Sequence, residues 1–370
     1  MNKKKWVRHI PLLIVEITVL IIAVGVLYVT LRTTSEVKKD NLNEKEIAVN
    51  EQIKQNFQET TSEETKEEEP SKYTGIFNIA FFGVDSRDEN LGKGNRSDTI
   101  MICSVNMDSH EVRLVSIYRD TYLNIGNDTY KKCNSAYAFG GPQQALGMIN
   151  MNTDLYITDY VTVGFEGLTK AVDALGGIEI DVTEAEIKHL NNYQISMVGT
   201  TTDGEHFTAT AGTDYIPVTT AGRQVLNGLQ TTAYCRIRHV GDDFARAERQ
   251  RNVLIAMMEK AKGASLGSLT DAVNAVLPNI RTSVDIADIF SMLGVIGDFR
   301  VTVSDGFPFE GMRSGGTIRT EGACVVPVSL ENNVVRLHEV LFDDYSYVPS
   351  RELQVFSAQV EADTSDYLQY

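Results

Sequence analysis

Hydrophobic and polar positions divide the chain into stretches of different character, and the first is a membrane-spanning pattern. Residues 10–31 are mostly apolar and follow a cluster of Lys and Arg side chains. A helix of this length is about 33 Å long, enough to cross a bilayer core. The basic cluster favours the cytoplasm, so residues 1–9 are expected inside and the rest of the chain outside the cell. The alternative is a cleaved signal peptide, but this apolar run exceeds a typical one and no Ala-x-Ala-like site follows it.

The next stretch, residues 32–72, is rich in glutamate and almost free of aromatic residues. This composition predicts an acidic stalk exposed to solvent. The pattern becomes globular from residue 73, where strands are predicted over Ile76–Val84, 100–105 and 112–117. If these strands run up, down and up, one edge of the sheet gathers the residues at their ends. Those residues are Asp85, Asp98 and Arg119.

Helices and strands alternate further along the chain, at 143–151, 156–163, 167–175 and 178–182. The alternation predicts the α/β class with a central sheet, and the Thr- and Gly-rich stretch 199–217 is expected to be a loop. Residues 73–262 form the predicted main domain. Residues 263–370 contain two further helical patterns, at 286–296 and 332–341, and are expected to pack as an appendage with a frayed end.

The densest candidate chemistry lies between residues 232 and 251. A strand is predicted over 232–238, with Arg236 and Arg238 about 6.8 Å apart on one face. A helix then runs to Lys262, and its buried stripe extends back to polar side chains at its start, namely Gln250, Arg246 and Asp243. An isolated Arg–Asp pair is usually a structural ion pair. Here, however, the arginines at 236, 238, 246, 249 and 251 outnumber the acids at 242, 243 and 248. Because unpaired buried charge is costly, the excess predicts an anionic ligand.

Overall charge limits what that anion can be. The chain has 34 Lys+Arg and 50 Asp+Glu, a net charge of −16, which argues against a free nucleic-acid binder. Walker and HExxH patterns are absent from the sequence, which disfavours P-loop and zinc-hydrolase chemistry. Four cysteines are too few for a disulfide scaffold, although a bond between Cys103 and Cys133 stays open.

Several segments together resemble the LytR-CpsA-Psr family, over about residues 75–262 and in the family's order. They are Gly83-Val84-Asp85-Ser86-Arg87, Arg96-Ser97-Asp98-Thr99, Ser116-Ile117-Tyr118-Arg119-Asp120, Lys132-Cys133-Asn134-Ser135-Ala136-Tyr137 with Gly140-Gly141, and Arg236-Ile237-Arg238 with Asp243, Arg246, Arg249 and Gln250. The chain departs from the family at two positions. Tyr118 stands where proline is usual, and Leu123 stands where many relatives carry a further arginine.

The resemblance implies an α/β/α sandwich with a central mixed sheet and an apolar lipid tunnel. It implies a membrane-anchored enzyme that transfers a teichoic acid or capsule type of glycopolymer from undecaprenyl pyrophosphate to peptidoglycan. By the same resemblance, Asp85 and Asp98 hold Mg²⁺, and Asp243 is the base for the attacking hydroxyl or a group that orients it. Arg119 and Arg238 belong with Asp243 in the catalytic set. The implied pyrophosphate contacts are Arg119, Arg236, Arg238, Arg246, Gln250, Lys132 and Arg87.

The sequence is also compatible with two other functions. The same metal and arginines would serve a lipid pyrophosphatase that uses water. A membrane-bound regulator without enzymatic activity is the second alternative. It is weakened by a predicted cytoplasmic part of about ten residues, too short for a helix-turn-helix.

Overall fold

The computed structural model describes residues 38–40, 42–58, 60–61, 68–69, 71–85, 90–201, 203, 206–318 and 320–369. The predicted membrane helix at 10–31 and the candidate site residue Arg87 therefore lie outside the described residues. Within the described ranges, no helix combines the length and apolar character needed to cross a membrane.

A mixed seven-stranded sheet forms the centre of the molecule, in the order β1-β14-β9-β4-β5-β6-β15. Neighbours β4, β5 and β6 are antiparallel, as predicted, whereas β9 runs parallel to β4 and β15 parallel to β6. The strands in chain order are β1 Lys38–Lys39, β4 Ile76–Val84, β5 Ser97–Asn106, β6 Glu111–Ile117, β9 Asp159–Val163, β14 Ile280–Thr282 and β15 Arg300–Phe307.

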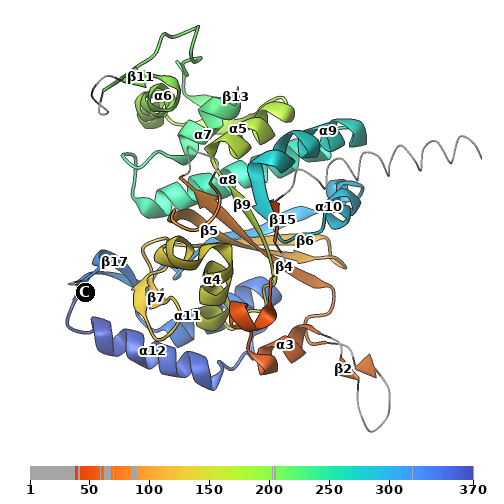
Figure 1. Cartoon of the computed structure of the whole chain (residues 1–370), viewed down its shortest axis with the longest axis vertical. Helices are drawn as coiled ribbons and strands as arrows, with labels where there is room; N and C mark the ends of the chain where they lie inside the picture. The colour runs from red at the N-terminus through yellow and green to blue at the C-terminus, as the bar shows by residue number, and fades with distance from the viewer. Residues whose placement is uncertain are drawn as a thin grey trace, which may run out of the picture.

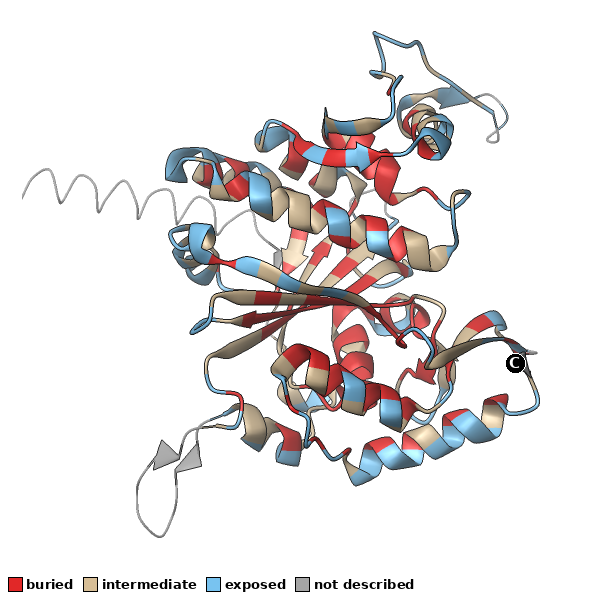
Figure 2. Ribbon diagram, turned by 180° about the vertical axis from the view of Figure 1, so that it is seen from behind, coloured by how far each residue is buried: buried red, intermediate tan, exposed pale blue. Residues whose placement is uncertain are grey.

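Helices cover both faces of this sheet, which confirms the three-layer α/β/α architecture (Figure 1). One face packs against α4 Ser135–Thr153, α11 Leu330–Phe342 and α12 Arg351–Thr364. The opposite face packs against α8 Asp243–Lys262, with α5 Phe165–Ala174, α9 Leu266–Val276 and α10 Ile286–Leu293 beside it. Figure 2 shows the buried residues concentrated along the sheet and on the helix faces turned toward it.

A smaller unit stands beside the central sheet and carries part of the site. Strand β10 Ile178–Val182 pairs with β13 Gly222–Leu226 in a separate two-stranded sheet, next to α6 Glu184–Val198 and α7 Gly228–Cys235. The prediction of a strand over 232–238 is wrong, because residues to Cys235 belong to α7. An Asn227–Gln230 capping box starts this helix. Residues 230–235 are all buried, so packing overrides the strand preference of Thr231, Thr232 and Tyr234.

Part of the predicted acidic stalk is folded against the main domain. This part forms two short helices, η1 Glu44–Ile47 and α3 Glu51–Phe57. Ile47 and Ile53 are buried, and Ile47 lies in the core beside α4. Further upstream, Asp40 accepts hydrogen bonds from Tyr160 Oη at 2.6 Å and Arg281 Nε at 2.7 Å. The expectation of a solvated segment is therefore wrong for residues 42–58, whose few apolar side chains fix them to the core.

The C-terminal part is integral to the fold, contrary to the expectation of an appendage. It supplies β14 and β15 to the central sheet, and the predicted helices near 286 and 332 are confirmed as α10 and α11. A second sheet contains β16 Arg313–Ile318, β17 Gly322–Pro327 and β18 Leu368–Gln369. The expectation of a frayed end is therefore wrong, because β18 pairs with β16. The remaining elements are short: β2 Thr60–Thr61, β3 Glu68–Glu69, β7 Tyr122–Asn124, β8 Tyr130–Lys132, β11 Thr200–Thr201, β12 Phe207–Thr208, η2 Leu277–Asn279 and η3 Ile296–Asp298.

Candidate active site

Two strand ends bring acidic and basic side chains together at one edge of the central sheet. Strands β4 and β5 are antiparallel and Val84 pairs with Ser97, so the end of β4 and the start of β5 lie at the same edge of the sheet, with Asp85 just past one and Asp98 at the other. Asp98 accepts hydrogen bonds on both oxygens, from Arg119 Nη1 and, at 2.9 Å, from Arg238 Nη2. The predicted gathering of these groups is thereby confirmed.

Further arginines reach the same place from the junction of α7 and α8. Helix α7 ends at Cys235, and Asp242 caps the start of α8 by accepting from Phe244 N and Ala245 N. Arg246 and Gln250 are one turn apart on the inward face of α8, as their spacing predicts, whereas Asp243, expected on the same face, is 43% exposed and does not line the cavity. Arg236 and Arg238 are not on a strand, but both still face this cavity.

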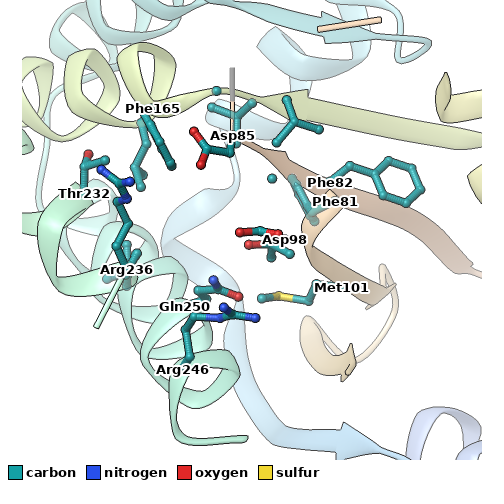
Figure 3. Close-up of a pocket in the computed structure, with 18 of the residues that line it drawn as sticks. Phe81, Phe82, Asp85, Asp98, Met101, Phe165, Thr232, Arg236, Arg246 and Gln250 are labelled. Atoms are coloured by element: carbon teal, nitrogen blue, oxygen red, sulfur yellow. The ribbon is translucent and has the colours of Figure 1, made fainter. Parts of the chain in front are cut away.

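The side chains surround a cavity of about 330 Å³ that is lined by both polar and apolar residues (Figure 3). Phe81, Phe82, Met101, Leu254 and Met257 are among its apolar lining residues. The charged and polar lining consists of Asp85, Asp98, Arg236, Arg238, Arg246 and Gln250. This is the arrangement needed to hold an anion beside an apolar group.

Arg246 is the strongest sign of an anion site. Its side chain is almost fully buried and pairs with Asp243 at 3.1 Å, but its Nε and Nη1 have no hydrogen-bond partner. Burial lowers the pKa of the Arg246 guanidinium, and the Asp243 carboxylate only partly opposes this effect. Buried donors without acceptors are costly unless a ligand satisfies them.

Asp120 bridges two basic groups behind the Asp98 pair. It lies 3.4 Å from Arg119 Nε and 3.3 Å from Lys132 Nζ. Burial acts to lower the pKa of Arg119, but the carboxylates of Asp98, Asp120 and Asp243 outweigh it and raise the pKa. Lys132 is not among the residues that line the cavity, so its place in this structure is as a partner of Asp120.

Two arginines of the predicted cluster have structural partners instead. Arg249 donates from Nε to Glu186 at 2.6 Å and from Nη1 to the Ile237 carbonyl at 3.2 Å, while Arg251 Nε donates to Ser304 at 3.0 Å. Of the five arginines, those at 236, 238 and 246 line the cavity. Glu186 was missed because it lies 63 residues away in sequence, on α6.

A second cavity, of about 440 Å³, lies between the sheet and helices α8, α9 and α10. Asp288 is the one charged residue among the described residues that line it. Phe81, Leu254 and Met257 line both cavities, so the polar site and this apolar space share a wall. Cys103 faces the apolar space, and all four cysteines are buried and free, which settles the open question of a Cys103–Cys133 bond.

Asp85 and Asp98 are the candidate ligands of a divalent cation. Figure 3 shows both carboxylates directed into the cavity. No three His, Cys, Asp or Glu side chains form a possible metal cluster in the ranges that the structure describes. Two carboxylates nevertheless fit Mg²⁺, which commonly takes one or two of them and completes its shell with water and phosphate oxygens. Each Asp98 oxygen bonded to an arginine keeps a further lone pair for such an ion.

A three-layer fold in which a cavity lined by arginines and carboxylates adjoins an apolar cavity is suited to amphiphilic anions. The model of the LytR_cpsA_psr family matches residues 30–302, and the chain belongs to this family. The polyisoprenyl-teichoic acid–peptidoglycan teichoic acid transferase TagU of Enterococcus faecalis is 31% identical over 216 residues. That alignment covers 57% of this chain and 63% of TagU, less than two thirds of the relative's length.

Solved structures support the fold. An Enterococcus faecalis protein described as a transcriptional regulator has a TM-score of 0.59 and 24% identity, and the match covers 80% of this chain and 97% of that one. The family protein YwtF (TagT) with bound octaprenyl pyrophosphate lipid has a TM-score of 0.53 and 19% identity, covering 77% and 96%.

Proposed function

We propose that this protein is an enzyme that transfers a glycopolymer of the teichoic acid or capsule type from undecaprenyl pyrophosphate to peptidoglycan, forming a phosphodiester. The observation that carries the proposal is the wall shared by an arginine-lined polar cavity and an apolar cavity. A lipid pyrophosphate has the matching chemistry, since its headgroup is anionic and its chain is hydrocarbon. The names of TagU and of the lipid-bound TagT structure agree with this choice.

The headgroup would bind between α8 and the ends of β4 and β5. Arg236, Arg238 and Arg246 supply forked donors there, and Gln250 adds an amide. The partnerless Nε and Nη1 of Arg246 would gain phosphate oxygens as acceptors. Arg119 is not among the lining residues, but its hydrogen bond to the lining residue Asp98 would place it where it can stabilise charge on the leaving phosphate.

The reaction then needs alignment and charge neutralisation more than covalent catalysis. A hydroxyl of a muramic acid residue attacks the phosphorus attached to the glycopolymer, and a new P–O bond forms. The bond from that phosphorus to the bridging oxygen breaks, and undecaprenyl phosphate leaves with the electron pair. Asp243, whose side chain is 43% exposed beside Arg246, takes up the proton of the attacking hydroxyl.

Mg²⁺ held by Asp85 and Asp98 would neutralise part of the pyrophosphate charge. The proposal also includes the membrane anchor at 10–31, with the catalytic domain on the outer side. A lipid substrate in the outer leaflet and a peptidoglycan acceptor would meet the enzyme on that side of the membrane.

The test offers full-length protein in lipid nanodiscs a pyrophosphoryl-linked lipid glycan and Mg²⁺, with and without peptidoglycan oligomers. Glycan attached to the oligomer, together with released lipid monophosphate, supports transfer. Release in the absence of acceptor at the same rate would instead favour a lipid pyrophosphatase. No turnover under either condition would remove both enzymatic functions and leave the regulator.

A pair of variants sharpens this test. Arg238→Ala removes a cavity arginine and its bond to Asp98, and we expect it to abolish turnover with the fold intact. Arg223→Ala removes an exposed arginine paired with Glu179, far from these contacts, and should leave turnover unchanged.

A further inference from the structure

An aromatic and cationic cluster joins the C-terminal part of the chain to two elements of the site. The Arg313 guanidinium on β16 lies 4.0 Å from the centroid of the Phe244 ring and 5.1 Å from that of Tyr118. The two rings meet edge to face, with centroids 4.5 Å apart. Arg313 Nη1 also donates to Tyr118 Oη at 3.3 Å and to the Pro308 carbonyl at 3.1 Å.

Each ring of this cluster is the immediate neighbour in sequence of a site residue. Tyr118 precedes Arg119, just past the end of β6, and Phe244 follows Asp243 at the start of α8. Arg119 and Asp243 attract each other, and Asp243 pairs with Arg246. The cluster therefore connects the end of β6 to the start of α8 at the point where their charged groups must be aligned.

The packing around Tyr118 shows that its position is tightly defined. Its amide donates to the Phe307 carbonyl of β15 at 3.0 Å. A Cβ added at Gly306 would come within 2.0 Å of Tyr118 Oη, so only glycine at this position leaves room for the ring. Burial raises the pKa of Tyr118, with Arg313 and Arg251 opposing, and the neutral phenol accepts the hydrogen bond from Arg313.

We propose that Arg313 is a positioning residue that holds Tyr118 against Phe244 and so fixes Arg119 relative to Asp243. Arg313 lies past residue 302, where the family match ends. Its cation–π contacts and its hydrogen bonds act together, because one planar guanidinium makes both. The kinetic consequence of this inference rests on the proposed transferase function, whereas the structural consequence does not.

The structural consequence is tested by hydrogen–deuterium exchange on the full-length protein. In Arg313→Ala we expect faster amide exchange in residues 118–121 and 243–247, with a melting temperature close to wild type. Arg313→Lys keeps a cation over the rings and should restore part of the protection. Arg336→Ala removes another C-terminal arginine, which pairs with Glu339 on α11, and should change neither segment. Unchanged exchange of both segments in Arg313→Ala would overturn the inference.

The kinetic consequence is tested in the transfer assay. Misplacement of aligned groups by about 1 Å can cost about a hundredfold in rate, so kcat of Arg313→Ala should fall by about ten- to a hundredfold. KM for the lipid should stay near the wild-type value, since the cavity arginines at 236, 238 and 246 are untouched. A wild-type kcat in Arg313→Ala contradicts the inference and leaves the proposed function standing. If the wild-type protein itself transfers nothing, the proposed function fails, and the exchange experiment alone decides the role of Arg313.

Discussion

Replacing Arg246 with methionine should make the ligand-free protein more stable while removing its activity. Two side-chain nitrogens of Arg246 are buried without partners, and each such group costs about 1–3 kcal/mol. The contact with the half-exposed Asp243 carboxylate returns about 0–1 kcal/mol. Because water in the cavity can satisfy part of this demand, we take the lower end and expect Arg246→Met to stabilise the protein by about 1–2 kcal/mol.

The same substitution three residues later provides the matched control. Arg249 is also buried, but its bonds go to Glu186 and to the carbonyls of Ile237 and Val240. Arg249→Met would leave the buried Glu186 carboxylate unpaired, and we expect it to destabilise the protein by about 3–5 kcal/mol. Two methionines on one helix should therefore shift stability in opposite directions.

Thermal and denaturant unfolding, with and without added inorganic pyrophosphate, measure both effects. Pyrophosphate should raise the melting temperature of the wild-type protein and not that of Arg246→Met, because ligand binding stabilises only the folded state that binds it. A loss of stability in Arg246→Met comparable with that in Arg249→Met would refute the reasoning. Arg246 would then be a structural residue whose partners are already present.

Further predictions concern the metal, the apolar cavity and pH. EDTA should abolish transfer, and added Mg²⁺ should restore it. The variant Asp98→Asn also weakens the bonds to Arg119 and Arg238, so it should stay inactive at any Mg²⁺ concentration. Full activity of the wild-type protein in EDTA would exclude a role for the metal. Met257→Trp places a large ring in the wall shared by the two cavities. It should raise KM about tenfold for a substrate with a long polyprenyl chain but little for a substrate with a short, soluble chain. Equal effects on the two substrates would contradict the lipid site. Burial lowers the pKa of His338 to about 4, so this side chain stays neutral in the folded protein. The unfolded state binds the proton first, and stability should fall by about 3 kcal/mol as pH drops from about 6.5 to about 4. In urea unfolding, His338→Gln should flatten this dependence of the unfolding free energy on pH. An unchanged dependence would show that His338 is not the group responsible.

Local patterns predicted the part of the fold that holds the carboxylates. Apolar runs predict β4, β5 and β6, a short polar turn joins the last two, and the up-and-down order of the three strands brings Asp85, Asp98 and Arg119 to one edge. A period of 3.6 residues likewise predicted that Arg246 and Gln250 face inward on α8.

Other features depend on contacts that the sequence pattern does not contain. The segment 232–238 has strand-forming residues, but burial on all sides makes most of it a helix. Glu186, the partner of Arg249, is distant in sequence, so the sequence pattern did not reveal that Arg249 forms a structural ion pair. The apolar cavity arises only when α8, α9 and α10 meet the sheet, and a single apolar side chain, Ile47, holds η1 in the core amid acidic neighbours.

The central claim is that one ligand occupies both cavities, with its pyrophosphate among the arginines and its chain under α8. The most direct test is a crystal structure of this protein with a polyprenyl pyrophosphate bound. We predict phosphate oxygens within hydrogen-bond distance of Arg236, Arg238 and Arg246, and the isoprenoid chain passing Phe81, Leu254 and Met257. A pyrophosphate bound away from these arginines, or a chain that leaves the space between α8 and the sheet empty, would contradict the account.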